Sequence, residues 1–132
     1  MTDAPARALA QARLVQAAET LHEADVLAQA GLWRGVINRA YYAMFYAVQA
    51  LAAWRQEPLS KHSGAIAFFD REFVKPGQIG REHSRELHFG FDRRQATDYG
   101  ETLEADPDEA RQALIEARSF VAAVAAFLET AE

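Results

Sequence analysis

Apolar residues recur at intervals of three and four along most of this chain, which is the spacing of amphipathic α-helices. The first such stretch runs from Asp3 to Ala30 and is followed by Gly31, a residue type common just after helix C-termini. Because only Gly31 and Leu32 separate it from the next helical stretch, we expect the first two helices to form an antiparallel hairpin.

The stretch from Trp33 to Trp54 is predicted to be the central helix. Its apolar positions form an arc wider than one neighbouring helix could cover, so we expect several helices to pack around it. These positions are Trp33, Val36, Ile37, Ala40, Tyr41, Met44, Val48, Leu51 and Ala52. The remaining arc, which we call the polar stripe, consists of Asn38, Arg39, Tyr42, Tyr46 and Gln49. We expect it to be an interface or a ligand site.

A shorter third helix is predicted after the central one. Pro58 ends the central helix, and Ser60 or Ser63 can cap a helix that continues through Phe73. Its apolar side consists of Ile66, Phe69 and Phe73.

Two more helices complete the prediction. The fourth starts between residues 79 and 82 and ends near Tyr99, and the fifth follows the cap formed by Asp106 and Pro107. The predicted fold class is therefore all-α, an up-down bundle of four long helices and one short helix in a single domain over residues 1–132.

One face of the predicted fourth helix carries both apolar and charged residues. Leu87, Phe91, Arg94 and Asp98 share this face. A buried charge without a partner would be strongly unfavourable, so Arg94 and Asp98 are expected to pair with each other or with a partner molecule.

The composition excludes several classes of protein. The chain has 132 residues and 50% of them are hydrophobic, enough for one domain with a core. It contains no cysteine, which excludes disulfides, a thiolate zinc site and a cysteine nucleophile. The apolar run from Ala40 to Trp54 is shorter than the roughly 20 residues that span a membrane. With no signal-peptide pattern, the protein is expected to be cytoplasmic and not membrane-bound.

Charge is distributed unevenly along the chain, whose net charge is −5. Residues 60–94 hold seven basic and five acidic groups, whereas residues 98–132 hold two and nine. Three of the four histidines also lie in the more basic middle segment. A negatively charged ligand is therefore expected to bind there.

The strongest candidate site combines the end of the fourth helix with the polar stripe. Its members are Arg93, Arg94, Asp98 and Tyr99, with Arg39, Tyr42 and Tyr46. Arginine offers a planar fork that fits phosphate oxygens, and tyrosine offers a stacking face and a hydroxyl, so this set indicates a phosphate, nucleotide or RNA ligand. A structural ion pair capped by a tyrosine would explain the same residues and remains the alternative.

Lys61 and His62 form a second candidate for anion binding, because they stand at the expected start of the third helix, where free backbone N–H groups favour anions. The simpler alternative is that Ser63 caps this helix and His62 faces solvent. No metal site is indicated, because the spacing of His83 and His88 puts them on different faces of a helix.

Five motifs spread over the chain form a joint pattern: Asn38 to Tyr46, Lys61 to Gly64, Phe73 to Lys75, Arg94 to Tyr99 and Ala117 to Val121. This pattern resembles the small stand-alone HEPN (higher eukaryotes and prokaryotes nucleotide-binding) proteins of bacteria and archaea. The resemblance implies a helical bundle that forms a homodimer and is often encoded beside a minimal nucleotidyltransferase as a toxin–antitoxin pair. Many members are ribonucleases that need no metal, and no cofactor is implied.

The sequence departs from the family's ribonuclease motif, in which a histidine follows an arginine by one or two turns and the pair meets its twofold copy. Asp98 stands where the histidine after Arg94 would be expected. Two other arginine–histidine pairs have a suitable spacing but lack the family's context, namely Arg55 with His62 and Arg81 with His88.

For RNA cleavage, the resemblance implies transesterification, in which a base removes the ribose 2′-hydroxyl proton and an arginine stabilises the phosphorane. Arg94 would be the stabilising residue, and Asp98 or His62 would be the base. Tyr99 lies near the position at which some partner nucleotidyltransferases modify HEPN proteins. The alternative function is a noncatalytic adaptor that binds a protein partner through the polar stripe.

Overall fold

Helices form most of the structure, a computed structural model that describes residues 3–59, 62–100 and 105–131. These residues contain five α-helices and no strand, which confirms the predicted all-α bundle. None of the helices, as far as they are described, is long and apolar enough to cross a membrane. The elements are α1 (Ala4–Gln29), α2 (Trp33–Arg55), α3 (His62–Phe69), a π-helical segment η1 (Asp70–Val74), α4 (Arg81–Tyr99) and α5 (Pro107–Thr130).

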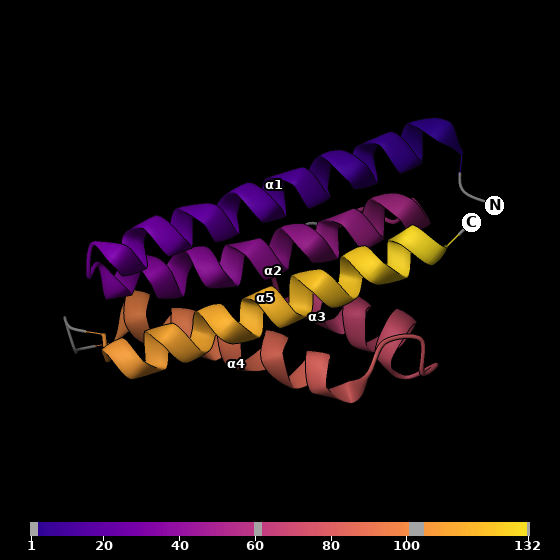
Figure 1. Ribbon diagram of the computed structural model, residues 1–132. Helices are drawn as coiled ribbons and strands as arrows, with labels where there is room; N and C mark the ends of the chain where they lie inside the picture. Colours follow the sequence, from indigo (N-terminus) through magenta and orange to yellow (C-terminus); the bar gives the residue numbers. More distant parts are fainter. Residues whose placement is uncertain (1–2, 60–61, 101–104, 132) are drawn as a thin grey trace.

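Helix α2 occupies the centre of the bundle, as its wide apolar arc predicts. Helices α1 and α2 form an antiparallel hairpin, and α5 and α4 lie below α2 in the view of Figure 1. Each of the other α-helices packs against α2. The start of α1 and the end of α5 lie at the same end of the bundle (Figure 1).

The ends of the α1–α2 hairpin follow from local chemistry. Asp3 caps α1 by accepting a hydrogen bond from the backbone N–H of Ala6 at 2.8 Å. At the other end, Gly31 has a φ of +73°, a left-handed conformation that glycine adopts freely. The N–H of Leu32 then donates to the carbonyl of Leu27 at 2.9 Å and closes the helix end.

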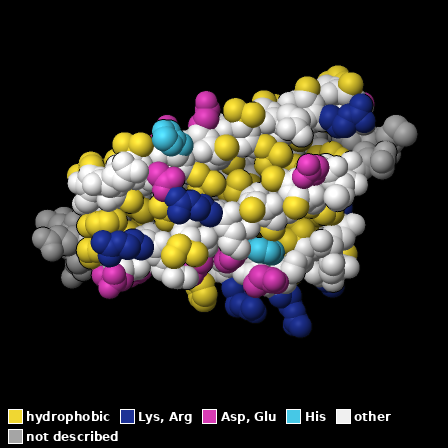
Figure 2. Space-filling model, viewed as in Figure 1, with side chains coloured by type: hydrophobic (Ala, Val, Ile, Leu, Met, Phe, Trp, Pro, Cys, Tyr) yellow, Lys and Arg dark blue, Asp and Glu magenta, His cyan; other side chains and the backbone are white. Residues whose placement is uncertain are grey.

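The core is built around the apolar arc of α2. Its fully or nearly fully buried residues are Val36, Ile37, Ala40, Tyr41, Ala43, Met44, Ala47, Val48, Ala50, Leu51 and Ala52. The five residues of the polar stripe are all partly exposed, so the helix divides into the two arcs that the sequence predicts. On the face shown in Figure 2, hydrophobic side chains are visible mainly in the seams between helices.

The third helix differs from the prediction because its second half is π-helical. This segment, η1, keeps Phe73 fully buried beside Phe69 of α3. Asp70, its first residue, accepts a hydrogen bond from Ser84 Oγ at 2.7 Å and binds His88 Nε2 at 2.8 Å. Asp70 therefore ties the π-helical turn to α4. Apolar spacing alone predicts a plain helix here, because a single π turn has too little length to show a period of its own.

Helix α5 begins as predicted, with Pro107 in its first turn and the Asp106 carboxylate accepting from the N–H of Asp108 at 3.1 Å. Its buried face includes Leu114, Ala117, Phe120, Val121 and Val124, whereas Ala125 and Leu128 are partly exposed.

Replacing Gln56 with glycine is expected to stabilise the protein. Gln56 ends α2 with a φ of +58°, a left-handed conformation that costs a residue with a Cβ atom roughly 1 kcal/mol. Glycine avoids this strain, so we expect the free energy of unfolding to rise by about 0.5 kcal/mol and Tm by about 2 °C, as measured by circular dichroism. The matched control Gly31→Ala adds a Cβ in open space at a φ of +73° and should lower Tm. A lower Tm for Gln56→Gly, or a higher Tm for Gly31→Ala, would contradict the left-handed conformation of that residue.

Candidate functional site

The candidate site lies where α4 packs against α2. The side chain of Arg94 is 13% exposed, and its Nε donates to Asp98 Oδ2 at 3.2 Å. Its guanidinium carbon lies 5.5 Å from the ring centroid of Tyr41 and 5.3 Å from that of Tyr42. The positive charge is thus held against electron-rich rings. Arg94 points inward on α4 and pairs with Asp98, as the face shared with Leu87 predicts, but Asp98 on the same face is exposed.

Gly90 allows α4 to approach α2 closely enough for this contact. It is buried one turn before Arg94, and a Cβ atom there would overlap with Met44 Cε and touch the Tyr41 ring. Because Met44 is itself packed in the core, it has little room to move aside. The missing side chain at Gly90 therefore permits α4 to lie close to α2 one turn before Arg94.

Arg94 covers a group of rings from three helices that we call the ring cluster. Tyr41 is fully buried at its base, with its ring centroid 5.5 Å from that of Tyr42 and 5.9 Å from that of Phe91. Most of the pairs are edge-on or tilted, as aromatic quadrupoles favour. Since Tyr42 and Tyr46 are partly exposed, the cluster also has an open edge. Its members are Tyr41, Tyr42, Phe45, Tyr46, His62 and Phe91.

His62 is packed into the ring cluster, so the alternative in which it simply faces solvent is wrong. Its Nδ1 lies 2.8 Å from Tyr41 Oη, and its ring stacks on Phe45 with the centroids 4.3 Å apart. Its centroid lies 5.5 and 5.6 Å from those of Tyr41 and Tyr42, the two rings that Arg94 covers. Burial, together with the charge of Arg94, lowers the pKa of His62, so the imidazole is neutral at neutral pH.

Arg39 approaches the same cluster from the polar stripe. Its guanidinium carbon lies 5.1 Å from the Tyr42 ring centroid, so two arginines contact this ring. Arg39 also donates to Asn38 Oδ1 at 2.9 and 3.1 Å and to Glu23 Oε1 at 3.3 Å. Within the described chain, the hydroxyls of Tyr42 and Tyr46 have no hydrogen-bond partner and neither is buried, which leaves both open to a ligand.

Two residues predicted for the site do not join the ring cluster. Arg93 turns toward α5, where its Nη1 donates to Glu116 Oε1 at 2.6 Å. Tyr99 is 75% exposed at the last residue of α4. A third predicted residue, Lys61, and the predicted cap Ser60 lie outside the described residues. The residues that the structure brings together are Arg39, Tyr42, Tyr46, His62, Arg94 and Asp98.

Comparison with known proteins identifies the family of this bundle. A family model described as the HEPN domain matches residues 10–127. The chain belongs to the HEPN family. It is 35% identical over 114 residues to a UPF0332 protein of Thermotoga maritima, covering 86% of each chain. Two Methanocaldococcus jannaschii proteins named "Putative toxin" are 30% and 33% identical over 110 and 111 residues, covering 83% and 84% of this chain and 75% and 82% of theirs.

In neither of the two spaced arginine–histidine pairs does the described part of the chain bring the arginine and histidine side chains into contact. In the first spaced pair, Arg55 binds Glu72 of η1 at 2.8 Å and not His62. In the second, His88 binds a carboxylate of η1. The histidine that accompanies Arg94 in this HEPN chain comes instead from α3. Over the described ranges, no three histidine or carboxylate side chains gather into a group that could hold a metal ion.

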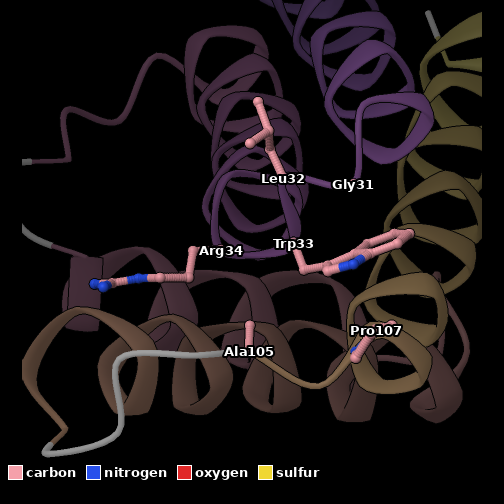
Figure 3. A pocket seen from close by; sticks show the side chains of 6 residues that line it. All are labelled: Gly31, Leu32, Trp33, Arg34, Ala105 and Pro107. Carbon is pink, nitrogen blue, oxygen red and sulfur yellow. The ribbon is translucent and has the colours of Figure 1, made fainter.

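A separate cavity of about 410 Å³ lies where the α1–α2 turn faces the start of α5. In it, Trp33 and Arg34 point in opposite directions (Figure 3). Arg34 donates to the carbonyl of Thr97 at 3.0 Å and so satisfies a backbone acceptor at the end of α4. No residue of the ring cluster is among the described residues that line this cavity, which are Gly31, Leu32, Trp33, Arg34, Ala105 and Pro107.

Tyr41 is the residue of the candidate site that the sequence predicts only as a core residue. It is buried as predicted, but its hydroxyl is bonded to His62. Burial raises the pKa of this hydroxyl far above its ordinary value; the charge of Arg94 opposes the shift and Tyr42 adds to it. The sequence could have indicated this role, because Tyr41 places a phenol hydroxyl within an apolar arc and a buried hydroxyl requires a hydrogen-bond partner.

Proposed function

We propose that this HEPN protein binds RNA or a nucleotide at the ring cluster and acts as the toxin of a toxin–antitoxin pair. The observation that carries the proposal is the guanidinium of Arg94, held against Tyr41 and Tyr42 beside the neutral ring of His62. Arginine N–H groups bind phosphate oxygens, and the partly exposed tyrosines offer faces on which bases stack. The name "Putative toxin" of two relatives supports the toxin part.

The proposal includes a homodimer in which the open edge of the ring cluster faces a second copy. The partly exposed polar stripe supports this arrangement, since hydroxyls such as those of Tyr42 and Tyr46 find partners at an interface. Size-exclusion chromatography with light scattering measures the mass of the protein in solution, and we expect the mass of two chains. The antitoxin is proposed to be a minimal nucleotidyltransferase, and the exposed Tyr99 is accessible to such an enzyme.

The proposal extends to RNA cleavage without a metal ion. After a base takes its proton, the ribose 2′-oxygen attacks the adjacent phosphorus and the bond to the 5′-oxygen breaks. The 5′-oxygen takes a proton from water, and a 2′,3′-cyclic phosphate remains. Arg94 would stabilise the charge that develops on the phosphorane. Asp98 and His62 are the two candidates for the base, because Asp98 is the carboxylate that pairs with Arg94 and His62 is the imidazole on which the Arg94 charge acts.

Incubation of the purified protein with total RNA, with and without a chelator, tests this function. We expect RNA binding and cleavage that the chelator does not change. Arg94→Gln removes the charge but keeps a polar side chain, and it should weaken RNA binding at least about tenfold. The matched control is Arg7→Gln, an exposed arginine of α1 remote from α4, which should bind RNA like the unaltered protein.

A second variant, Asp98→Asn, separates binding from cleavage. It removes a negative charge beside Arg94, so RNA binding should be kept or strengthened. If Asp98 is the base, RNA cleavage should be lost. RNA binding by Arg94→Gln that is as strong as that of the unaltered protein would contradict the proposal. Should the unaltered protein bind neither RNA nor mononucleotides, a noncatalytic adaptor that uses the polar stripe becomes the better account.

A further inference from the structure

The buried hydroxyl of Tyr41 has one hydrogen-bond partner in the described parts of the chain, Nδ1 of His62 at 2.8 Å. Tyr41 is 0% exposed, so its hydroxyl proton has no access to bulk water. A buried donor without an acceptor carries the full cost of desolvation. The proton therefore points at Nδ1, and Tyr41 is the donor of this bond.

This direction of donation determines which nitrogen of His62 carries a proton. Because Nδ1 accepts, the neutral imidazole must be protonated at Nε2. Burial raises the pKa of the Tyr41 hydroxyl, which keeps it protonated as the donor. Burial and the charge of Arg94 lower the pKa of His62, which keeps the ring neutral.

Packing presents the protonated nitrogen of His62 to a ligand. Phe45 stacks on one face of the ring with centroids 4.3 Å apart, and Tyr42 meets it at 87° with centroids 5.6 Å apart. With Nδ1 bound to Tyr41, Nε2 lies on the far side of the ring. In the described structure Nε2 has no partner and is not a buried unsatisfied atom, so its N–H group is available.

We propose that Tyr41 positions His62 as a neutral hydrogen-bond donor, and that His62 Nε2–H and the Arg94 guanidinium together bind one phosphate group of a nucleotide or RNA. The inference rests on the proposed function and assigns the role of His62 within it. Arg94 uses Nε for Asp98, and its terminal nitrogens have no hydrogen-bond partner among the residues described. Such a set of donors complements phosphate oxygens, which only accept.

The same tautomer decides between the two candidate bases for cleavage. A protonated Nε2 can donate to a phosphate oxygen or a leaving oxygen but cannot take the proton of a 2′-hydroxyl. His62 is therefore a binding residue that donates a hydrogen bond and keeps its proton, and Asp98 remains as the base.

Nitrogen-15 spectra of the histidine rings test the tautomer without any ligand. Protonated and unprotonated ring nitrogens differ widely in chemical shift, and the His62 signals are those that disappear in His62→Gln. We expect a protonated Nε2 and an unprotonated Nδ1 in the unaltered protein. In Tyr41→Phe, which removes the donor, both shifts should move toward the average of the two tautomers. A protonated Nδ1 in the unaltered protein would overturn the inference.

Binding of a fluorescently labelled RNA oligonucleotide tests the donor role. Glutamine can place an N–H group where Nε2 lies, whereas asparagine reaches only the position of Nδ1. We expect His62→Gln to bind RNA within about threefold of the unaltered protein and His62→Asn to bind at least about tenfold more weakly. Equal affinities for the two variants, whether high or low, would overturn the role of Nε2–H.

The two arms distinguish failure of the inference from failure of the proposed function. Absence of RNA and mononucleotide binding by the unaltered protein would contradict the proposed function and the phosphate contact together, while the spectra would still show whether Tyr41 selects the tautomer. Strong RNA binding with a protonated Nδ1 would leave the function in place and overturn the inference.

Discussion

Replacing Phe69 with alanine is expected to lower the free energy of unfolding by about 3–5 kcal/mol. Phe69 of α3 is fully buried, with its ring centroid 4.9 Å from that of Phe120 on α5 and 6.3 Å from that of Phe73 on η1. The truncation removes apolar contacts and leaves a cavity that the surrounding helices can close only in part. The loss would be a large share of the roughly 5–15 kcal/mol that stabilises a typical domain.

Urea unfolding followed by circular dichroism measures this loss, and an unchanged slope of the transition shows that unfolding remains two-state. The matched control is Phe89→Ala, because Phe89 is 50% exposed on α4 and its removal should change stability by no more than about 0.5 kcal/mol. If Phe69→Ala does not fold, Phe69→Leu replaces it in the test, with an expected loss in free energy of unfolding of about 1 kcal/mol. A loss under about 1 kcal/mol in Phe69→Ala would contradict the packing of this ring against α5.

The second large effect is expected for Arg93→Met, which should lower the free energy of unfolding by about 2 kcal/mol. The side chains of Arg93 and Glu116 are each 16% exposed, and their 2.6 Å contact joins α4 to α5. Methionine keeps the apolar stem but leaves the Glu116 carboxylate with only Gln112 donating to it among the described residues. A poorly hydrated carboxylate without its cation destabilises the folded state.

The loss in free energy of unfolding caused by Arg93→Met is expected to be largest near neutral pH and smaller at acidic pH. Burial raises the pKa of Glu116, but the hydrogen bonds from Arg93 and Gln112 and the Arg93 charge outweigh it, so the pKa lies below its ordinary value. Such a carboxyl stabilises the folded state fully above its ordinary pKa and loses this contribution as the pH falls through the lowered value. Urea unfolding of both proteins at about pH 7 and pH 3 measures the change. An equal cost at both pH values would contradict the ion pair, and Arg93→Met/Glu116→Gln should recover part of the loss.

The helices were predictable because their signals are local. Apolar period, the Asp3 and Asp106 caps and the left-handed glycine at Gly31 all act within a few residues, so the described bounds agree with the predicted stretches to within one or two residues. The π-helical segment escaped prediction. Its turn is held by contacts of Asp70 with α4, and these exist only after the two segments dock.

The adjacent residues Arg93 and Arg94 show how far a spacing argument reaches. Both were predicted for one site, but successive residues point about 100° apart around a helix. Arg94 consequently faces the rings of α2, whereas Arg93 faces Glu116 of α5. The face shared with Leu87 predicted the direction of Arg94 correctly, since that argument used the helical period and not proximity in the chain.

From the residues alone, the fold class, the central place of α2 and the family could be inferred, because repeating spacings and short motifs are written along the chain. The meeting of Arg94 with His62 could not, since the two come from different helices and are distant in sequence. That meeting depends on how closely α4 approaches α2 at Gly90 and on the packing of His62 against Tyr41 and Phe45. Packing of this kind is collective: it joins three helices at once, and no interval along a single helix encodes it.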